Sequence, residues 1–218
     1  MPQKKKKSSP SEAGKRPYVL VSNDDGIAAP GIAALICALQ PIADLIVVAP
    51  DGPRSGAACS ITSTVPVSYR LVSDEPGLKA YACTGTPTDC VKLALHALCE
   101  RRPDLVASGI NLGNNASVCT FYSGTMGAAT EGCIKGIPSI GFSLDTFDAS
   151  QANYQPCVEH IVRIAQHVLA NGLPPYTMLN VNFPNTDRIK GIKACRMAMG
   201  DWQHEWHRIE CPRGGDHH

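Results

Sequence analysis

Short, continuous apolar runs recur along this chain and alternate with helix-like stretches. The runs occupy residues 18–21, 45–49, 105–108, 139–143 and 178–182. Runs of this length without polar alternation are typical of strands whose two faces are both buried in a parallel sheet. The helix-like stretches occupy residues 32–39, 86–99, 123–135 and 158–169. This order predicts a Rossmann-like α/β fold of three layers, with a parallel-dominated sheet between two layers of helices.

One segment, residues 61–82, departs from this alternation. It contains β-prone stretches around 65–69 and 79–82, and the turn-forming residues 75–77 separate them. We therefore expect a β-hairpin inserted into the α/β pattern. Thr86, Pro87 and Asp89 follow the hairpin and have the spacing of a capping box with proline at the first helical position, so a helix should begin there.

Two adjacent acids, Asp24 and Asp25, come directly after the first apolar run. The carboxyl ends of strands are where open α/β sheets bind their ligands. Two neighbouring carboxylates repel each other there and are costly to desolvate unless a cation neutralises them. Oxygen ligands suit Mg²⁺, Mn²⁺ or Ca²⁺. The pair by itself is equally compatible with a glycine turn that carries two solvated acids.

The loops after the second and third runs contain further oxygen donors. Ser55 offers a hydroxyl and Asn111 an amide carbonyl, and both loops should emerge at the same sheet edge as the acid pair. With Asp24 and Asp25, these side chains form a candidate ligand set for one divalent cation. These loops also contain glycines, which would permit close approach of the backbone to a bound group. The glycines are Gly52, Gly56, Gly109 and Gly113.

A candidate anion site follows at the start of the fourth helix-like stretch. Ser123, Gly124 and Thr125 would place two hydroxyls and free backbone N–H groups at a helix N-terminus. A metal ion beside an anion-binding site is an arrangement that enzymes use to hydrolyse phosphate esters. Asn23 and Gly109, which lie next to the candidate ligands in sequence, are further candidates for substrate contact.

Composition argues against several other classes of protein. The formal net charge is +1, so there is no overall basic field, and we expect no stable nucleic-acid partner. Residues 1–16 include the run Lys4 to Lys7 and are expected to form a disordered basic tail. No apolar stretch reaches membrane-spanning length, and no apolar signal region follows the lysines. These features predict a soluble cytoplasmic protein without membrane contact.

The ten cysteines are expected to be reduced thiols. Four of them, Cys37, Cys90, Cys99 and Cys133, fall within predicted helices, and no pair has the Cys-x-x-Cys spacing. Buried thiols fit this distribution better than a disulfide scaffold or a zinc site.

Five motifs in order resemble the SurE family, the survival-protein phosphatases and nucleotidases, between about Tyr18 and Asn182. The motifs are residues 21–27, residues 48–51 with Arg54 and Ser55, residues 85–91, residues 108–113, and residues 122–125 with Glu131 and Gly132. The resemblance implies a metal-dependent phosphomonoesterase that acts on nucleoside 5′- and 3′-monophosphates, and in some members on short polyphosphate. It places one divalent cation per subunit on Asp24, Asp25, Ser55 and Asn111. It also places the segment 123–125 at the border of the phosphate pocket.

The resemblance further implies a division of the chain and an oligomeric state. Residues 17–195 would form the phosphatase domain, residues 196–218 a C-terminal extension shorter than the family's, and the subunits a homodimer through the α/β domain. Within this pattern, catalysis is assigned to Asp24, Asp25 and Asn111. One departure is Cys59, which stands before the residues 60–62 where the family usually has histidine.

Two alternatives remain open from the sequence. A phospho-receiver domain also places an acidic pair after its first strand, but its acceptor aspartate at the end of the third strand is absent, since residues 106–108 are Val-Ala-Ser. A family relative that binds metal or nucleotide with weakened catalysis is the other alternative, and Cys59 and the short extension keep it open.

Overall fold

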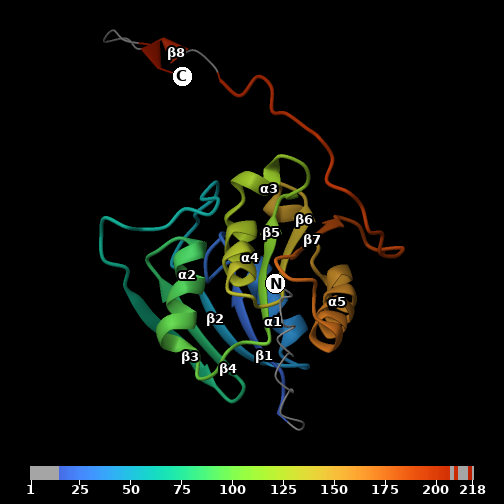
Figure 1. Ribbon diagram of the computed structural model, residues 1–218. Helices are drawn as coiled ribbons and strands as arrows, with labels where there is room; N and C mark the ends of the chain where they lie inside the picture. Colours follow the sequence, from blue (N-terminus) through green and yellow to red (C-terminus); the bar gives the residue numbers. More distant parts are fainter. Residues whose placement is uncertain (1–14, 207–208, 211–215, 218) are drawn as a thin grey trace, which may run out of the picture.

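The computed structural model describes residues 15–206, 209–210 and 216–217, and its centre is a seven-stranded sheet (Figure 1). The strand order is β3-β4-β2-β1-β5-β6-β7, and all neighbours are parallel except β3 and β4. The strands are β1 Tyr18–Ser22, β2 Asp44–Pro50, β3 Tyr69–Glu75, β4 Leu78–Cys83, β5 Leu105–Leu112, β6 Ser139–Asp145 and β7 Leu179–Pro184. A separate two-stranded pair joins β8 Ile209–Glu210 and β9 Asp216–His217.

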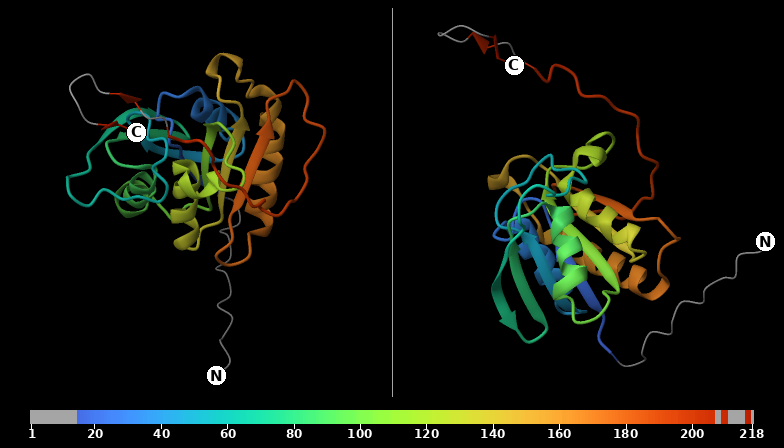
Figure 2. Two further views of the ribbon diagram at one scale, coloured as in Figure 1. Left: turned by 90° about the horizontal axis from the view of Figure 1, so that it is seen from above. Right: turned by 60° about the vertical axis from the view of Figure 1, so that its left-hand side comes forward.

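Helices cover both faces of the sheet (Figure 2). One layer holds α1 Pro30–Leu39 and α5 Val158–Asn171, which pack against each other. The opposite layer holds α2 Pro87–Leu93, extended by a π-helical turn Ala94–Leu98, and α4 Gly124–Ile134. The short helix α3 Cys119–Tyr122 precedes α4, and 3₁₀ turns cover Ala149–Gln151 and Gln155–Cys157. The predicted three-layer α/β fold is confirmed.

The central strands are buried on both faces, as their continuous apolar runs predict. Along β1, Val19 and Val21 pack in the core beneath α1 and α5, whereas Leu20 packs in the second core beneath α2 and α4. All three side chains are fully buried. At about 25 cal/mol per Å² of apolar surface removed from water, burial of each of these side chains contributes roughly 1.5–3 kcal/mol to the stability of the sheet.

Local signals for helix starts agree with the structure. The Thr86 side chain accepts a hydrogen bond from the Asp89 N–H, and the Asp89 carboxylate accepts one from the Thr86 N–H, which completes the predicted capping box at α2. Ser123 caps α4 by accepting from the Met126 N–H at 3.1 Å. These caps satisfy backbone donors that a helix leaves free at its first turn.

Two boundaries differ from the sequence expectation. The hairpin is present, but its first strand begins at Tyr69, so residues 65–68 belong to a loop. Its second strand, β4, pairs in parallel with β2, so the hairpin extends the main sheet at one edge. The third predicted strand continues past Ser108 to Leu112, because Asn111 and Leu112 pair with β6 after a register shift.

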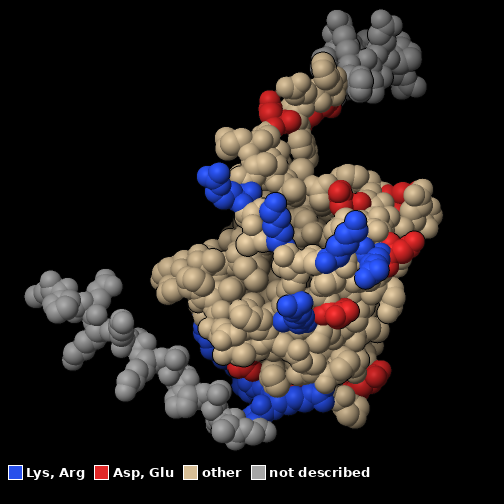
Figure 3. Space-filling view, turned by 90° about the vertical axis from the view of Figure 1, so that its right-hand side faces the viewer, with Lys and Arg blue, Asp and Glu red and all other residues tan. Residues whose placement is uncertain are grey.

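The chain after β7 leaves the domain body as an exposed, extended segment (Figures 1 and 3). It touches the body near α3, where the Ser117 hydroxyl donates to the Ala198 carbonyl at 3.1 Å and the Trp202 ring lies 5.2 Å from the Tyr122 ring. Of the predicted C-terminal extension 196–218, residues 207–208, 211–215 and 218 lie outside the described part, as does most of the predicted tail 1–16. Among the described helices, none has the length and apolarity that crossing a membrane requires.

The cysteines of the described residues form no disulfide, and Cys37, Cys59 and Cys195 are exposed. Cys83, Cys90, Cys133 and Cys157 are buried.

Candidate functional site

The acid pair lies where β1 ends, at the carboxyl edge of the sheet. Asp24 is buried with 4% of its surface exposed, and Asp25 is half-buried. Asn23 is fully buried beside them and donates through Nδ2 to the Gly26 carbonyl at 2.9 Å, which stabilises the turn. A parallel sheet brings the loops of its central strands to this edge, so the acids meet side chains that are distant in sequence.

The first turn of α4 packs directly on Asp24. The Thr125 hydroxyl, itself fully buried, donates a hydrogen bond to Asp24 Oδ1. Gly124 makes this approach possible, because a Cβ atom there would lie 2.7 Å from Asp24 Cβ and 3.0 Å from Oδ2. The Ser123 oxygen is engaged in capping the helix. The structure therefore brings the predicted anion segment 123–125 against the predicted metal ligand.

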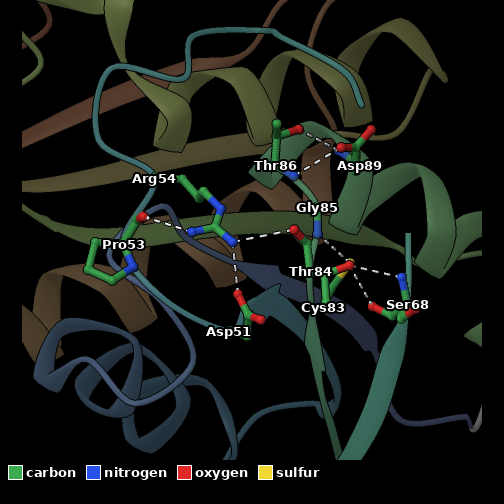
Figure 4. Close-up of polar contacts among 9 residues, drawn as sticks. All are labelled: Asp51, Pro53, Arg54, Ser68, Cys83, Thr84, Gly85, Thr86 and Asp89. Carbon is green, nitrogen blue, oxygen red and sulfur yellow. Dashed lines mark hydrogen bonds and ion pairs between the residues drawn. The ribbon is translucent and has the colours of Figure 1, made fainter. Parts of the chain in front are cut away.

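The loop after β2 is tied to the same acid by its backbone. The Arg54 N–H donates to the Asp24 carbonyl at 2.7 Å, which holds the loop that carries Ser55 to the backbone of the acid pair; the Ser55 side chain is exposed. Figure 4 shows the Arg54 guanidinium pointing toward the Asp51 carboxylate, at 2.9 Å, and the Thr84 carbonyl, at 3.3 Å. Arg54 thus links the loops after β2 and β4, a role that its sequence motif did not reveal.

The loop at the end of β5 is attached to the second acid. Asp25 Oδ2 accepts a hydrogen bond from the Leu112 N–H at 3.1 Å. The neighbouring Asn111 donates through Nδ2 to the Gly113 carbonyl at 2.7 Å, which fixes its amide and leaves Oδ1 as the acceptor atom. Gly109 has a φ of +129° and packs where a Cβ would lie 2.3 Å from the Phe142 carbonyl oxygen, so tight strand packing by itself demands glycine there. Its predicted contact with phosphate stays a prediction.

The environment of the acids changes their acidity. Burial raises the pKa of Asp24 to about 6; the hydrogen bond from Thr125 opposes this shift, and the charge of Asp25 adds to it. Burial also raises the pKa of Asp25, against the Leu112 N–H, which stabilises its ionised form. Because burial disfavours the ionised form of both carboxylates, positive charge close to them would stabilise that form in both.

The donor set fits a hard divalent cation. Two carboxylates, the Ser55 hydroxyl and the Asn111 carbonyl are oxygen donors. Hydrogen bonds from the Arg54 N–H to the Asp24 carbonyl and from the Leu112 N–H to the Asp25 carboxylate join the segments that carry Ser55 and Asn111 to the acid pair. The buried Asn23 Oδ1 has no hydrogen-bond partner among the described residues, so an acceptor oxygen adjacent to the acids remains unsatisfied. No three His, Cys, Asp or Glu side chains cluster in the described chain, so such a site depends on the serine and asparagine oxygens.

Cys59 lies on an exposed loop that is fastened on both sides of it. The Ala58 N–H donates to the Tyr122 carbonyl at 3.0 Å, directly before the α4 cap. After it, the Thr86 hydroxyl donates to the Ser60 carbonyl at 2.7 Å, and the Thr62 N–H donates to the Asp89 carboxylate. The loop therefore connects the starts of α2 and α4, close to the segment 123–125.

Asn115 is a structural residue whose role the sequence did not indicate. It is buried, its N–H donates to Asn182 Oδ1 at 2.8 Å, and its Nδ2 donates to the Ser143 hydroxyl at 2.8 Å. Its carbonyl accepts from the Thr120 hydroxyl and from Asn180. This network holds the loop between β5 and α4 against β6 and β7. In the sequence, the only hint of this role is that Asn115 follows the motif 108–113.

Fold and site together define the class: a three-layer α/β protein whose buried acid pair, polar loops and helix N-terminus converge at the carboxyl edge of the sheet. The family model described as "Survival protein SurE" matches residues 19–204. The chain is 52% identical over 203 residues to 5′-nucleotidase SurE of Bacteroides thetaiotaomicron, with 93% of this chain and 77% of the relative covered. It is 44% identical over 207 residues to the protein of the same name in Flavobacterium psychrophilum, with 93% and 80% covered.

A solved structure agrees. The SurE protein from Aquifex aeolicus superposes with a TM-score of 0.79 at 39% identity, over 92% of this chain and 80% of that chain. The chain belongs to the SurE family. Membership confirms the resemblance expected from the five motifs, and the match extends beyond Asn182 into the exposed segment.

Proposed function

We propose that this protein is a divalent-metal-dependent phosphomonoesterase that hydrolyses nucleoside 5′-monophosphates to nucleoside and phosphate. The observation that carries the proposal is the buried Asp24, contacted at once by Thr125 at the start of α4 and by the backbone of the Arg54–Ser55 loop. Two curated relatives that are 52% identical to this chain are named 5′-nucleotidase SurE, which supports the same reaction class.

Asp24, Asp25, Ser55 and Asn111 would hold the cation, which would be Mg²⁺, Mn²⁺ or Ca²⁺. When bound, such an ion supplies positive charge for phosphoryl oxygens and increases the acidity of water. The chain's own groups do the positioning. Thr125 fixes the orientation of the Asp24 carboxylate, and the Leu112 N–H fixes that of Asp25.

The phosphate would lie against the segment 123–125, with the buried Asn23 and Gly109 at the floor of the site. Backbone N–H groups at the start of a helix attract an anion because they carry partial positive charge and lack helical acceptors. Thr125 and Gly124 are close enough to Asp24 that an anion there and a cation on the acids would be neighbours. This arrangement would stabilise the charge that develops on the transferring phosphoryl group.

Aromatic side chains beside the phosphate segment favour a nucleotide over a small phosphate ester. Tyr122, which directly precedes Ser123, is half-exposed and its ring contacts Trp202. Base–aromatic stacking contributes about 1–3 kcal/mol per base and tolerates any base. Hydrolysis of 3′-monophosphates and of short polyphosphate is part of the same proposal, since the segment 123–125 would contact the phosphate group, which all these substrates share.

The test is release of inorganic phosphate from AMP by the purified protein. We expect turnover with Mg²⁺, Mn²⁺ or Ca²⁺, loss of turnover with excess EDTA, and recovery when the cation is restored. Unchanged turnover in EDTA would remove the metal from the proposal. Binding of AMP and metal without turnover would identify instead the catalytically weakened relative that Cys59 suggested.

We also propose a homodimer through the α/β domain. The extended segment after β7 exposes large apolar side chains, with Met199 95% and Trp206 74% exposed, and clusters of this kind favour association. Light scattering at several protein concentrations tests this, and a monomeric mass throughout would contradict it.

A further inference from the structure

A cavity lies at the end of the domain opposite the acid pair. Its volume is about 800 Å³, within the range of roughly 300–1,000 Å³ that is usual for small-molecule sites. Its lining residues come from the C-terminal end of α2 with its π-helical turn, from the connection that enters β5, and from the connection that enters β6. Figure 1 shows where these elements lie. Because these connections enter the parallel strands, the cavity is at their amino ends, whereas Asp24 follows the carboxyl end of β1.

Positive charge is in excess around this cavity. Lys92, Arg101, Arg102 and Lys135 line it. Lys92 and Lys135 share one carboxylate, Glu131, at N–O distances of 3.3 and 3.5 Å. Glu131 is itself buried, with 8% of its side chain exposed, so it faces the lysines rather than bulk water. One carboxylate therefore balances two ammonium groups.

The two arginines differ in how fully they are engaged. Arg101 pairs with Asp104 at 2.9 Å, donates to the Arg16 carbonyl and lies over the Tyr18 ring, so its guanidinium is committed. Arg102 donates to the Lys135 carbonyl at 2.6 Å, and no carboxylate of the described residues pairs with it.

The hydrogen bond between Arg102 and the Lys135 carbonyl holds the guanidinium beside the start of the β6 connection. It also brings Arg102 next to the residue whose ammonium group is shared with Lys92 through Glu131. A guanidinium held in place with N–H groups to spare is suited to bidentate contact with a phosphate.

Apart from His96, the remaining walls are apolar. Leu93, Leu95, Cys99 and Pro103 line the cavity, and Ile137 is buried to 2% exposure at its inner side. A purely inorganic anion would leave these side chains in contact with water. A ligand that carries an anionic group and an apolar body would satisfy both parts of the lining.

We infer that this cavity binds an organic phosphate: a dianionic phosphate group held by Lys92, Arg102 and Lys135, joined to an apolar or aromatic body that packs on the leucines and Ile137. Three cations with one buried carboxylate leave two positive charges, which match the charge of a phosphomonoester near neutral pH. The site is separate from the acid pair. Helix α4 connects the two, because it begins at Ser123 against Asp24 and ends at Lys135.

The experiment uses phenylphosphonate, a phosphomonoester analogue whose phosphorus–carbon bond is not hydrolysed. Its binding to the full-length protein is measured by isothermal titration calorimetry without added divalent metal. The pocket variant is Arg102→Gln with Lys135→Gln, and both side chains are exposed, so folding should be kept. The control is Lys193→Gln with Arg196→Gln, which removes the same charge from exposed positions in the segment after β7. Thermal unfolding verifies that both variants are folded.

We expect saturable binding of phenylphosphonate by the unmodified protein and weakening on the order of tenfold or more in the pocket variant, because charge-assisted hydrogen bonds are lost. The control variant should bind as the unmodified protein does. Inorganic phosphate and benzoate should each bind more weakly, since one lacks the apolar body and the other the second charge. Absence of saturable binding, or equal weakening in the two variants, would overturn the inference, as would binding that the pocket variant retains.

Discussion

Replacing Gly124 by alanine would put a methyl group into space that is already occupied. The added Cβ would lie 2.7 Å from Asp24 Cβ, 3.0 Å from Asp24 Oδ2 and 3.0 Å from Pro87 Cγ. Contacts under 3.0 Å require movement, and the nearest atoms belong to the buried acid on one side and to the rigid proline ring at the start of α2 on the other. Relief must therefore come from displacing Asp24 or the first turn of α4.

Overpacking of this kind costs about 1–3 kcal/mol. If the strain displaces Asp24, this energy is added to the activation free energy of the reaction. Each 1.36 kcal/mol lowers the rate about tenfold. We expect Gly124→Ala to lower kcat for AMP by about 10- to 100-fold, with a modest fall in Tm. The assay is phosphate release at saturating Mg²⁺ or Mn²⁺, together with thermal unfolding of the same preparation.

Gly52→Ala is the matched control. Gly52 lies in the loop after β2, and a Cβ there would meet only Arg54 Nη1 at 4.0 Å, which is ordinary contact. It should keep nearly full activity. Turnover of Gly124→Ala within twofold of the unmodified protein would refute the argument that close packing of α4 on Asp24 positions the acid.

Three further substitutions test separate parts of the site. Thr125→Val removes the hydroxyl donor to Asp24 and leaves a buried carboxylate oxygen without it, at a cost of about 1–3 kcal/mol, so kcat for AMP should fall about tenfold or more; unchanged kcat would contradict this. Thr86→Ala removes the α2 cap together with the hydrogen bond to the Ser60 carbonyl, and it should lower the free energy of unfolding by about 1–2 kcal/mol in urea titrations. Cys59→His should change the pH profile of kcat/KM between pH 5 and 9, because histidine titrates near neutrality; identical profiles would make the position structural only.

The sequence predicts best where local chemistry decides. The apolar run at β1 specified a strand buried on both faces, and the spacing of Thr86 and Asp89 specified a capping box that the structure contains. The extension of β5 to Leu112 was missed, because glycine and asparagine have low strand propensity and only pairing with β6 keeps them extended. Long-range partners of this kind leave no mark in local periodicity.

The candidate site also has parts that the sequence predicts and contacts that it does not predict. The acid pair and the segment 123–125 could be named from the rule that loops of a parallel sheet meet at one edge. The contact between Thr125 and Asp24 could not, since the two are separated by 101 residues and meet only through helix packing. The same holds for Arg54, whose bonds to Asp51 and Thr84 depend on the position of β4 beside β2.

The most direct test of the proposed reaction is the activity of Asp24→Asn and Asp25→Asn, each measured as phosphate release from AMP at saturating Mg²⁺ or Mn²⁺. Each substitution keeps the shape of the side chain and removes one ligand charge from the cation site. We predict a loss of at least ~10²-fold in kcat for each variant, with folding retained. Turnover close to that of the unmodified protein in both variants would contradict the assignment of the acid pair as the metal site.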